Sequence, residues 1–249
     1  MIPNKEIKIM ARKALHGQYS SFIILFLTAY ILENLIVSIP STFLAAPKNL
    51  PLFISQILLT VLLQALGSMV MLGVNLGALQ LIRGKRMSLG NMFFTFRNQA
   101  DHFLALELIF TAINTVASVP GFVFVWISNS MTMNFLTYSI ISSLFTGLSI
   151  VLTFLFTLAF SMSEFLMLDD PNLTAKESLL TSMRLIQGHT GQYFLLIASF
   201  LFLIILGFTS AMIGFIWVAP YIMVSQALFY ENLCDLEIEH YQSYGSDEK

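Results

Sequence analysis

The sequence has few charged residues and one cysteine. Asp, Glu, Lys and Arg make up 10% of the 249 residues, and hydrophobic residues make up 57%. A soluble domain carries about 25% charged residues. With a mean hydropathy of +0.79, the chain has too little polar surface to coat a soluble globule. This excludes a soluble enzyme, a nucleic-acid-binding protein and a disordered protein. The lone Cys234 excludes an internal disulfide and a cysteine metal cluster.

Four long runs contain no charged residue: 14–32, 49–82, 108–163 and 185–230. A helix needs about 20 apolar residues to cross a hydrocarbon core of roughly 30 Å. The runs lack the alternation of barrel strands, so helices are the expected way to satisfy the backbone in lipid. Turn-forming residues at 128–130 and 210–214 divide the two longest runs. The sequence therefore predicts an all-α membrane bundle of six transmembrane helices, at about 20–39, 53–82, 103–127, 135–167, 192–209 and 214–231.

The basic residues predict the orientation of these spans. All twelve Lys and Arg residues except Lys48 lie before the first span, between the second and third, between the fourth and fifth, or after the last. Basic residues concentrate on the cytoplasmic side of a membrane, so we expect both termini in the cytoplasm. Residues 1–235 are expected to form one membrane domain, followed by a polar acidic tail over 236–249. A signal peptide is the competing interpretation of the amino terminus, but PSTFLAAPKNLP offers no good cleavage site.

Each basic segment repeats one plan, a short amphipathic stretch ahead of an aromatic-led span. We therefore expect three hairpin units, each preceded by a short amphipathic helix in the membrane interface. The first such helix has one apolar face, which comprises Ile7, Met10, Ala11, Ala14 and Leu15.

The other two interfacial helices carry different signals. In the third, Thr174 and Glu177 form a capping box and Gly188 is placed to end the helix. Its apolar stripe comprises Leu179, Met183 and Ile186. The second is weaker: Ser88 is a candidate cap, and the face expected to point inward comprises Leu89, Phe93 and Phe96.

Two features bear on helix packing. Gly73 and Gly77 form a G-x-x-x-G motif, which permits close helix approach and which we interpret as packing rather than as a dimer interface. Pro220 is expected to kink the last span, and the Tyr221 hydroxyl is available to the carbonyl that the proline frees.

The last third of the chain carries a recognisable pattern. It comprises Asp170, Pro171, Ser182, Gly188, Phe194, Gly214, Pro220, Tyr221, Phe229 and Tyr230. With the basic segment ARKALHGQY near the start, it resembles the domain of unknown function 975 family of bacterial integral membrane proteins. Asp169 departs from the pattern, because the family often has a small or apolar residue there. The resemblance implies a six-span, multi-pass protein of the bacterial inner (cytoplasmic) membrane. It also implies a distant similarity to the membrane domain of bacterial glycerophosphodiester phosphodiesterases, whose catalytic domain has no counterpart here.

One carboxylate lies clearly within a predicted span. Glu33 is costly to place in a membrane and is by default a functional hypothesis. With Asn34, Asn75 and Asn114 it forms a candidate intramembrane polar site. The alternative is that Glu33 lies near the outer end of its span and is partly hydrated, while the amides make interhelical hydrogen bonds. The remaining embedded amides are Gln64, Gln80 and Gln226.

Two further glutamates, Glu107 and Glu164, lie near the predicted cytoplasmic ends of their spans. Solvent and basic residues are close there, so we expect interfacial salt bridges with Arg97 or Arg184.

The sequence contains no recognisable catalytic set. The four histidines fall in cytoplasmic segments without ligand spacing, and there is no phosphate-binding loop and no Gly-x-Ser-x-Gly motif. We expect no enzyme activity, no cofactor, no metal, and no nucleic-acid or nucleotide partner. The leading hypothesis is a non-enzymatic module that acts through lipids, another membrane protein or a secreted peptide, in export, immunity or envelope maintenance. The alternative is a small transporter or pore, which a cavity lined by Glu33, Asn75 and Asn114 would favour. An intramembrane enzyme is the third hypothesis.

Overall fold

The computed structural model describes residues 1–42, 50–128, 134–210 and 214–247. Lys48 and the turn residues expected at 129–130 and 211–213 lie outside this part of the chain. The described residues form helices and no strand. The elements are α1 (Asn4–Leu15), α2 (Tyr19–Thr42), α3 (Leu50–Ile82), η1 (Leu89–Phe93), α4 (Phe94–Arg97), α5 (Ala100–Ser128), α6 (Phe135–Phe160), α7 (Ser163–Asp169), α8 (Ala175–Ile186), α9 (Thr190–Ala198), α10 (Leu201–Thr209) and α11 (Phe215–Asp247).

Five segments of the described chain are long and apolar enough to cross a membrane. They are Tyr19–Pro40, Ile54–Ile82, Ala100–Gly121, Phe135–Asp169 and Thr190–Gly207, and they coincide with the first five predicted spans. The fourth contains α6 and α7, and the fifth contains α9 and most of α10, because the helix is interrupted within each. The region of the sixth prediction lies in α11, which continues to Asp247. The chain is therefore a multi-pass helical protein of membrane character.

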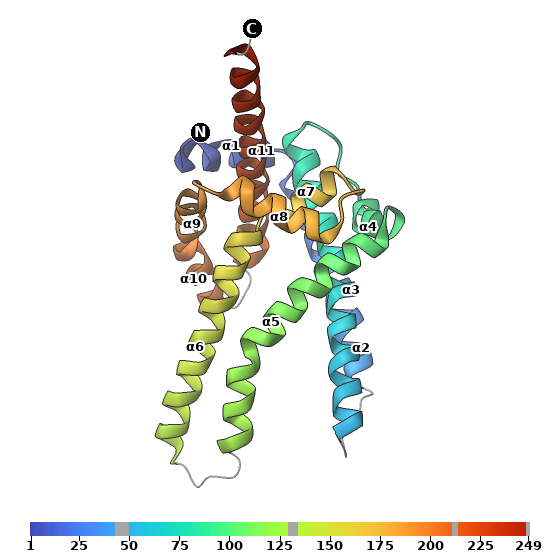
Figure 1. Ribbon diagram of the computed structural model, residues 1–249, viewed down its shortest axis with the longest axis vertical. Coiled ribbons are helices and arrows are strands. Elements are labelled where there is room, and N and C mark those ends of the chain that lie inside the picture. Colours follow the sequence, from blue (N-terminus) through green and yellow to red (C-terminus); the bar gives the residue numbers. More distant parts are fainter. Residues whose placement is uncertain (43–49, 129–133, 211–213, 248–249) are drawn as a thin grey trace.

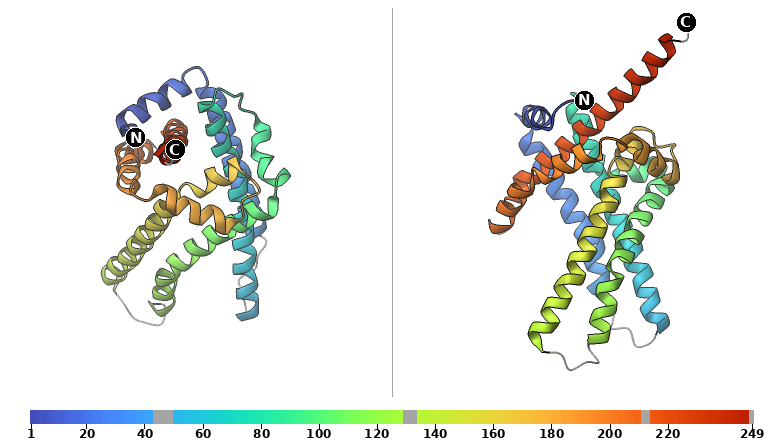
Figure 2. Two further views of the ribbon diagram at one scale, coloured as in Figure 1. Left: turned by 45° about the horizontal axis from the view of Figure 1, so that its top comes forward. Right: turned by 60° about the vertical axis from the view of Figure 1, so that its left-hand side comes forward.

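α2, α3, α5 and α6 extend toward the lower end in Figure 1, α11 projects past the upper end, and most of the short helices gather near that upper end (Figures 1 and 2). α2 pairs with α3, α3 contacts α5, and α5 contacts α6. α1, η1, α4, α7 and α8 lie at the upper end in Figure 1, where the N and C labels also stand. The basic segments thus share one end of the molecule, as their spacing in the sequence predicts.

The first and third amphipathic segments fold as their sequences predict. In α1, Ile7, Ala11 and Leu15 are buried, although Met10 on the same predicted face is exposed. In α8, the Thr174 hydroxyl accepts a hydrogen bond from the Glu177 N–H, and the Glu177 carboxylate accepts one from the Thr174 N–H.

The α8 stripe is only partly buried, and the helix ends as expected. Ile186 is buried, Leu179 is half-buried and Met183 is exposed. Gly188 follows the helix with φ +84°, in the left-handed region that glycine favours.

In the second amphipathic segment the buried and exposed faces are the reverse of those predicted. Leu89, Phe93 and Phe96, expected to face inward, are exposed, while the buried side chains are Asn91, Met92 and Thr95. Residues 89–93 form a 3-10 turn, which Ser88 caps by accepting from the Gly90 N–H. The buried face is the one that bonds to α3, through Asn91 to Gln80 and Thr95 to the Met69 carbonyl, so contacts with another helix decide which side chains are buried.

Gly73 permits the close approach of this segment to α3. A Cβ at Gly73 would lie 2.5 Å from the Asn91 carbonyl oxygen and would also clash with the Met92 Cα. Side chains fix the contact on both sides: the Thr95 hydroxyl donates to the Met69 carbonyl at 3.0 Å, and the Asn91 amide donates to the Gln80 side-chain oxygen at 2.8 Å. The small-residue motif therefore serves packing within one chain.

Arg83 joins three helices at the upper end of the bundle. Its guanidinium contacts both Asp169 oxygens, at 2.6 and 2.8 Å, and a Glu231 oxygen at 2.8 Å. The Tyr230 hydroxyl donates to Asp169 at 2.8 Å. Hydrogen bonds from Arg83 to Asp169 and Glu231 raise the pKa of the guanidinium further above its ordinary value. The charge at position 169, unusual for the resembled family, thus connects α3, α7 and α11.

Pro220 lies inside α11, but Tyr221 does not serve the carbonyl that the proline frees. Its hydroxyl donates instead to the Lys8 carbonyl of α1 at 3.3 Å. The Arg12 guanidinium lies 5.2 Å from the centre of the Tyr221 ring. Tyr221 therefore contacts α1 instead of bonding to a carbonyl of its own helix.

Candidate functional site: a polar cavity between α2, α3 and α5

Polar side chains form stripes on helices that face one another. On α5, Glu107, Thr111 and Asn114 are spaced four and three residues apart, so they share one face. Gln64 and Ser68 on α3 are four residues apart and likewise share a face. These faces meet because α3 packs against both α2 and α5.

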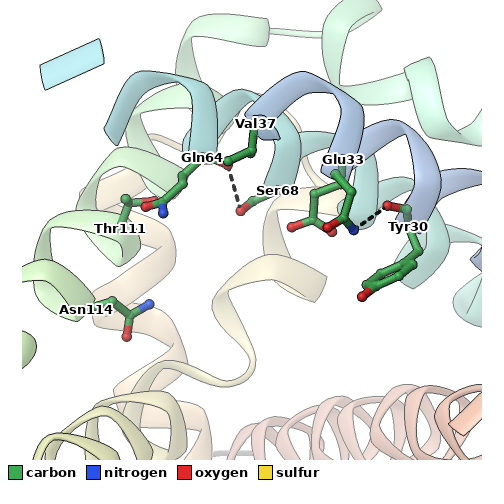
Figure 3. A pocket seen from close by; sticks show the side chains of 8 residues that line it. Tyr30, Glu33, Val37, Gln64, Ser68, Thr111 and Asn114 are labelled. Carbon is green, nitrogen blue, oxygen red and sulfur yellow. Dashed lines mark hydrogen bonds between the residues drawn. The ribbon is translucent and has the colours of Figure 1, made fainter. Parts of the chain in front are cut away.

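The stripes line an open outer cavity of about 470 Å³. In Figure 3, Thr111 and Asn114 of α5 lie on one side, Tyr30 and Glu33 of α2 on the other, and Gln64 and Ser68 of α3 between them. Ser68 donates to the Gln64 carbonyl and Asn34 to the Tyr30 carbonyl, each within its own helix. The lining is Tyr30, Glu33, Asn34, Val37, Gln64, Ser68, Thr111 and Asn114.

An inner cavity of about 260 Å³ adjoins the outer one and lies nearer the short helices. Ser68, Thr111 and Asn114 line both cavities, so the two are neighbours along one polar path. The side chains that line only the inner cavity are Met71, Leu72, Asn75, Glu107, Phe110, Thr157 and Glu164.

Glu107 and Glu164 face this inner cavity rather than the arginines. The Asn75 amide donates to a Glu164 carboxylate oxygen at 2.6 Å. Glu107 is only 4% exposed, and its Oε1 has no hydrogen-bond partner in the described part of the chain. The expected ion pairs with Arg97 or Arg184 do not occur among the described residues. The prediction was wrong because closeness along the sequence does not fix the direction of a side chain on a helix.

Three carboxylates therefore lie along one path inside the candidate spans. Glu107 and Glu164 line the inner cavity, and Glu33 lines the outer cavity that adjoins it. Neither cavity has a Lys, Arg or His among its described lining residues. An unpaired buried carboxylate is costly, and a nearby cation or a bound proton reduces that cost. The described residues contain no cluster of three acidic, His or Cys side chains able to hold a metal ion. The arrangement thus suits successive binding of a small cation or a proton.

The structure places the four residues of the candidate polar site along this path. Glu33, Asn34 and Asn114 line the outer cavity, and Asn75 lines the inner one. Sequence reasoning missed the role of Glu107 as a cavity residue. The signal was present in the spacing of Glu107, Thr111 and Asn114, which is that of one helical face.

The residues of the family pattern in the last third of the chain mainly form turns or pack between helices. Pro171 offers its carbonyl to the His102 ring at 3.3 Å, and Asp170 accepts from the Asn172 N–H. The Ser182 hydroxyl accepts from the Met162 N–H at 3.2 Å. A Cβ at Gly214 would lie 2.7 Å from the Ser210 hydroxyl oxygen.

The aromatic members of the pattern pair with neighbouring helices. Phe229 and Tyr230 are buried, against Tyr193 and Phe165 respectively. Phe194 contacts Phe154 of α6 edge-on.

The fold and the site define a class, a multi-pass helical membrane protein with a carboxylate-lined polar cavity. The chain belongs to the family described as Protein of unknown function (DUF975), whose model matches residues 1–237. Comparison with curated proteins and with solved structures gave no match.

Proposed function

We propose that the protein is a small transporter or pore that moves a small cation or protons across the membrane. The observation that carries the proposal is the pair of adjoining cavities lined by Glu33, Glu107 and Glu164, with no basic residue in the described lining. Ionisable residues within membrane spans mark ion pathways and proton relays. The transporter or pore, which was the alternative hypothesis from the sequence, is thus the function we prefer.

The proposal includes a topology of six spans in three hairpin units, in a bacterial inner membrane. α11 supplies the sixth span, and both termini lie in the cytoplasm. The gathering of α1 and α8, two helices that carry basic residues, at one end of the bundle supports this orientation, because basic residues concentrate on the cytoplasmic side.

A module that works by docking a partner is less well supported. That hypothesis relied on the amphipathic helices as docking faces. Ile7, Ala11 and Leu15 of α1 are buried within this chain, as are Leu185 and Ile186 of α8. These buried side chains offer little to a partner, although Met10, Met183, Leu89, Phe93 and Phe96 of the same amphipathic segments are exposed.

The test is a flux assay on purified full-length protein in lipid vesicles. A pH gradient is imposed and proton movement is followed with an internal pH dye, and uptake of isotope-labelled Na⁺, K⁺ or methylammonium is measured in turn. Opposite charges 4 Å apart attract by about 4 kcal/mol at an effective dielectric constant of 20. Glu107→Gln should therefore lower the flux at least about tenfold.

Asp101→Asn is the matched control, because Asp101 is a carboxylate on the same helix with a side chain 78% exposed. It should keep the wild-type flux. Wild-type flux of every probe at the level of protein-free vesicles would contradict transport, as would an equal loss in Asp101→Asn.

A further inference from the structure

A further cavity, separate from the outer and inner cavities of the polar path, lies where α8 meets α6 and α9. It has a volume of about 500 Å³ and a mainly apolar lining. α6 supplies Leu155, Leu158 and Ala159; α8 supplies Leu180, Met183, Arg184 and Ile186; Gln187 and Thr190 follow. We refer to these residues as the α8 groove.

The α8 groove includes exposed apolar side chains of both α6 and α8. Leu155 on α6 is 56% exposed, and Leu180 and Met183 on α8 are each 46% exposed. α8 lies across the upper end of α6 in Figure 1, which is the end where the basic segments gather. An amphipathic helix in this position lies at the boundary between headgroups and acyl chains.

Arg184 is the one ionic side chain among the described residues of the groove. It is exposed, and it makes no ion pair within the described part of the chain. Gln187 and Thr190 add polar groups to the lining. A guanidinium matches the oxygens of a phosphate with two parallel hydrogen bonds, so the groove combines a group that can bind an anion with a mainly apolar lining.

We propose that the α8 groove binds one anionic phospholipid from the cytoplasmic leaflet. The headgroup phosphate binds Arg184, and an acyl chain lies along Leu155, Leu158 and Ala159. Basic pockets between membrane helices bind anionic headgroups in this way. The site shares no residue with the polar cavities, so lipid binding there does not depend on transport, while the assignment to the cytoplasmic leaflet rests on the proposed orientation.

The test measures thermal unfolding of the purified full chain in detergent during titration with lipid. Phosphatidylglycerol, phosphatidylcholine and inorganic phosphate are compared. The wild type should bind phosphatidylglycerol about five-fold more tightly than phosphatidylcholine, the preference expected of one cation beside an anionic headgroup. Arg184→Gln should remove this preference, whereas Lys176→Gln, which removes a charge from the same helix outside the groove, should retain it.

A variant that leaves the charge intact tests the apolar part of the site. Ala159→Leu fills part of the groove, so it should weaken the binding of both lipids while retaining the preference for phosphatidylglycerol. Equal binding of the two lipids by the wild type would overturn the proposal. Stabilisation by inorganic phosphate equal to that by phosphatidylglycerol would also overturn it, because the site would then bind a free anion rather than a lipid. A preference that survives in Arg184→Gln would overturn the role of the arginine.

Discussion

Gly73 offers a sharp test of the packing between α3 and the segment 88–97. A Cβ at this position would lie 2.5 Å from the Asn91 carbonyl oxygen and would overlap the Met92 Cα. Both obstacles are backbone atoms, so no side-chain rotation relieves them. Gly73→Ala must therefore push the segment away from α3 and strain the bond from Thr95 to the Met69 carbonyl.

The expected cost follows from two opposing effects. Overpacking a tight interface costs about 1–3 kcal/mol, while replacing glycine by alanine within a helix gains about 0.5–1 kcal/mol. Because both obstacles are backbone atoms, the overpacking cost should lie in the upper part of its range, about 2–3 kcal/mol, so the net destabilisation of Gly73→Ala should be about 1–2.5 kcal/mol. Gly147→Ala in α6 should show only the stabilisation that alanine brings to a helix, because a Cβ there meets nothing within 4 Å. The change in stability caused by Gly77→Ala should lie between those of Gly73→Ala and Gly147→Ala, since the obstacle at Gly77 is the flexible end of the Leu25 side chain.

Thermal unfolding in detergent, followed by circular dichroism, measures this series. A change of 1 kcal/mol moves the Tm by about 2–4 °C in a chain of this size. Gly73→Ala should lower the Tm by several degrees, and Gly147→Ala should leave it unchanged or raise it. A Gly73→Ala variant as stable as the wild type would refute the close approach, as would an equal loss in Gly147→Ala.

Three other predictions concern single groups. Burial raises the pKa of Cys234 to about 11 from an ordinary value of 9.0, so maleimide should label the native thiol about 100-fold more slowly than a free cysteine at pH 7. Hydrogen bonds from the Thr174 N–H and hydroxyl lower the pKa of Glu177. The stability it contributes is therefore present above its ordinary pKa and lost as the pH falls through the lowered one, so the destabilisation by Glu177→Gln should vanish in acid unfolding experiments. Gly67→Ala, whose Cβ would lie 3.1 Å from the Glu33 Cγ, should reduce vesicle flux by displacing that carboxylate.

Local signals in the sequence predicted the elements well where one physical cause dominates. Charge-free runs locate the long helices because lipid excludes charge from a span, and five of the six predicted segments coincide with candidate spans. The capping box of Thr174 and Glu177 predicted the start of α8 because both partners lie within one helical turn.

The cavity could not be predicted from such signals. It forms only when α2, α3 and α5 meet, so the partners of Glu33 come from other helices. The direction of Glu107 and Glu164 depends on the rotation of each helix about its axis, and a nearby arginine in the sequence does not reveal it. The same uncertainty reversed the faces of the segment 88–97, where bonds from Asn91 and Thr95 to α3 decide which side is buried.

The central claim is that a polar, water-filled path lies between α2, α3 and α5 inside the membrane. Labelling of single cysteines with a charged methanethiosulfonate reagent, in intact vesicles and a Cys234→Ala background, tests it most directly. Ser68→Cys and Asn114→Cys line both cavities and should react at rates typical of hydrated thiols. Leu148→Cys, on the exposed apolar surface of α6, should remain unlabelled because lipid covers it. Cavity cysteines as unreactive as Leu148→Cys would contradict the account.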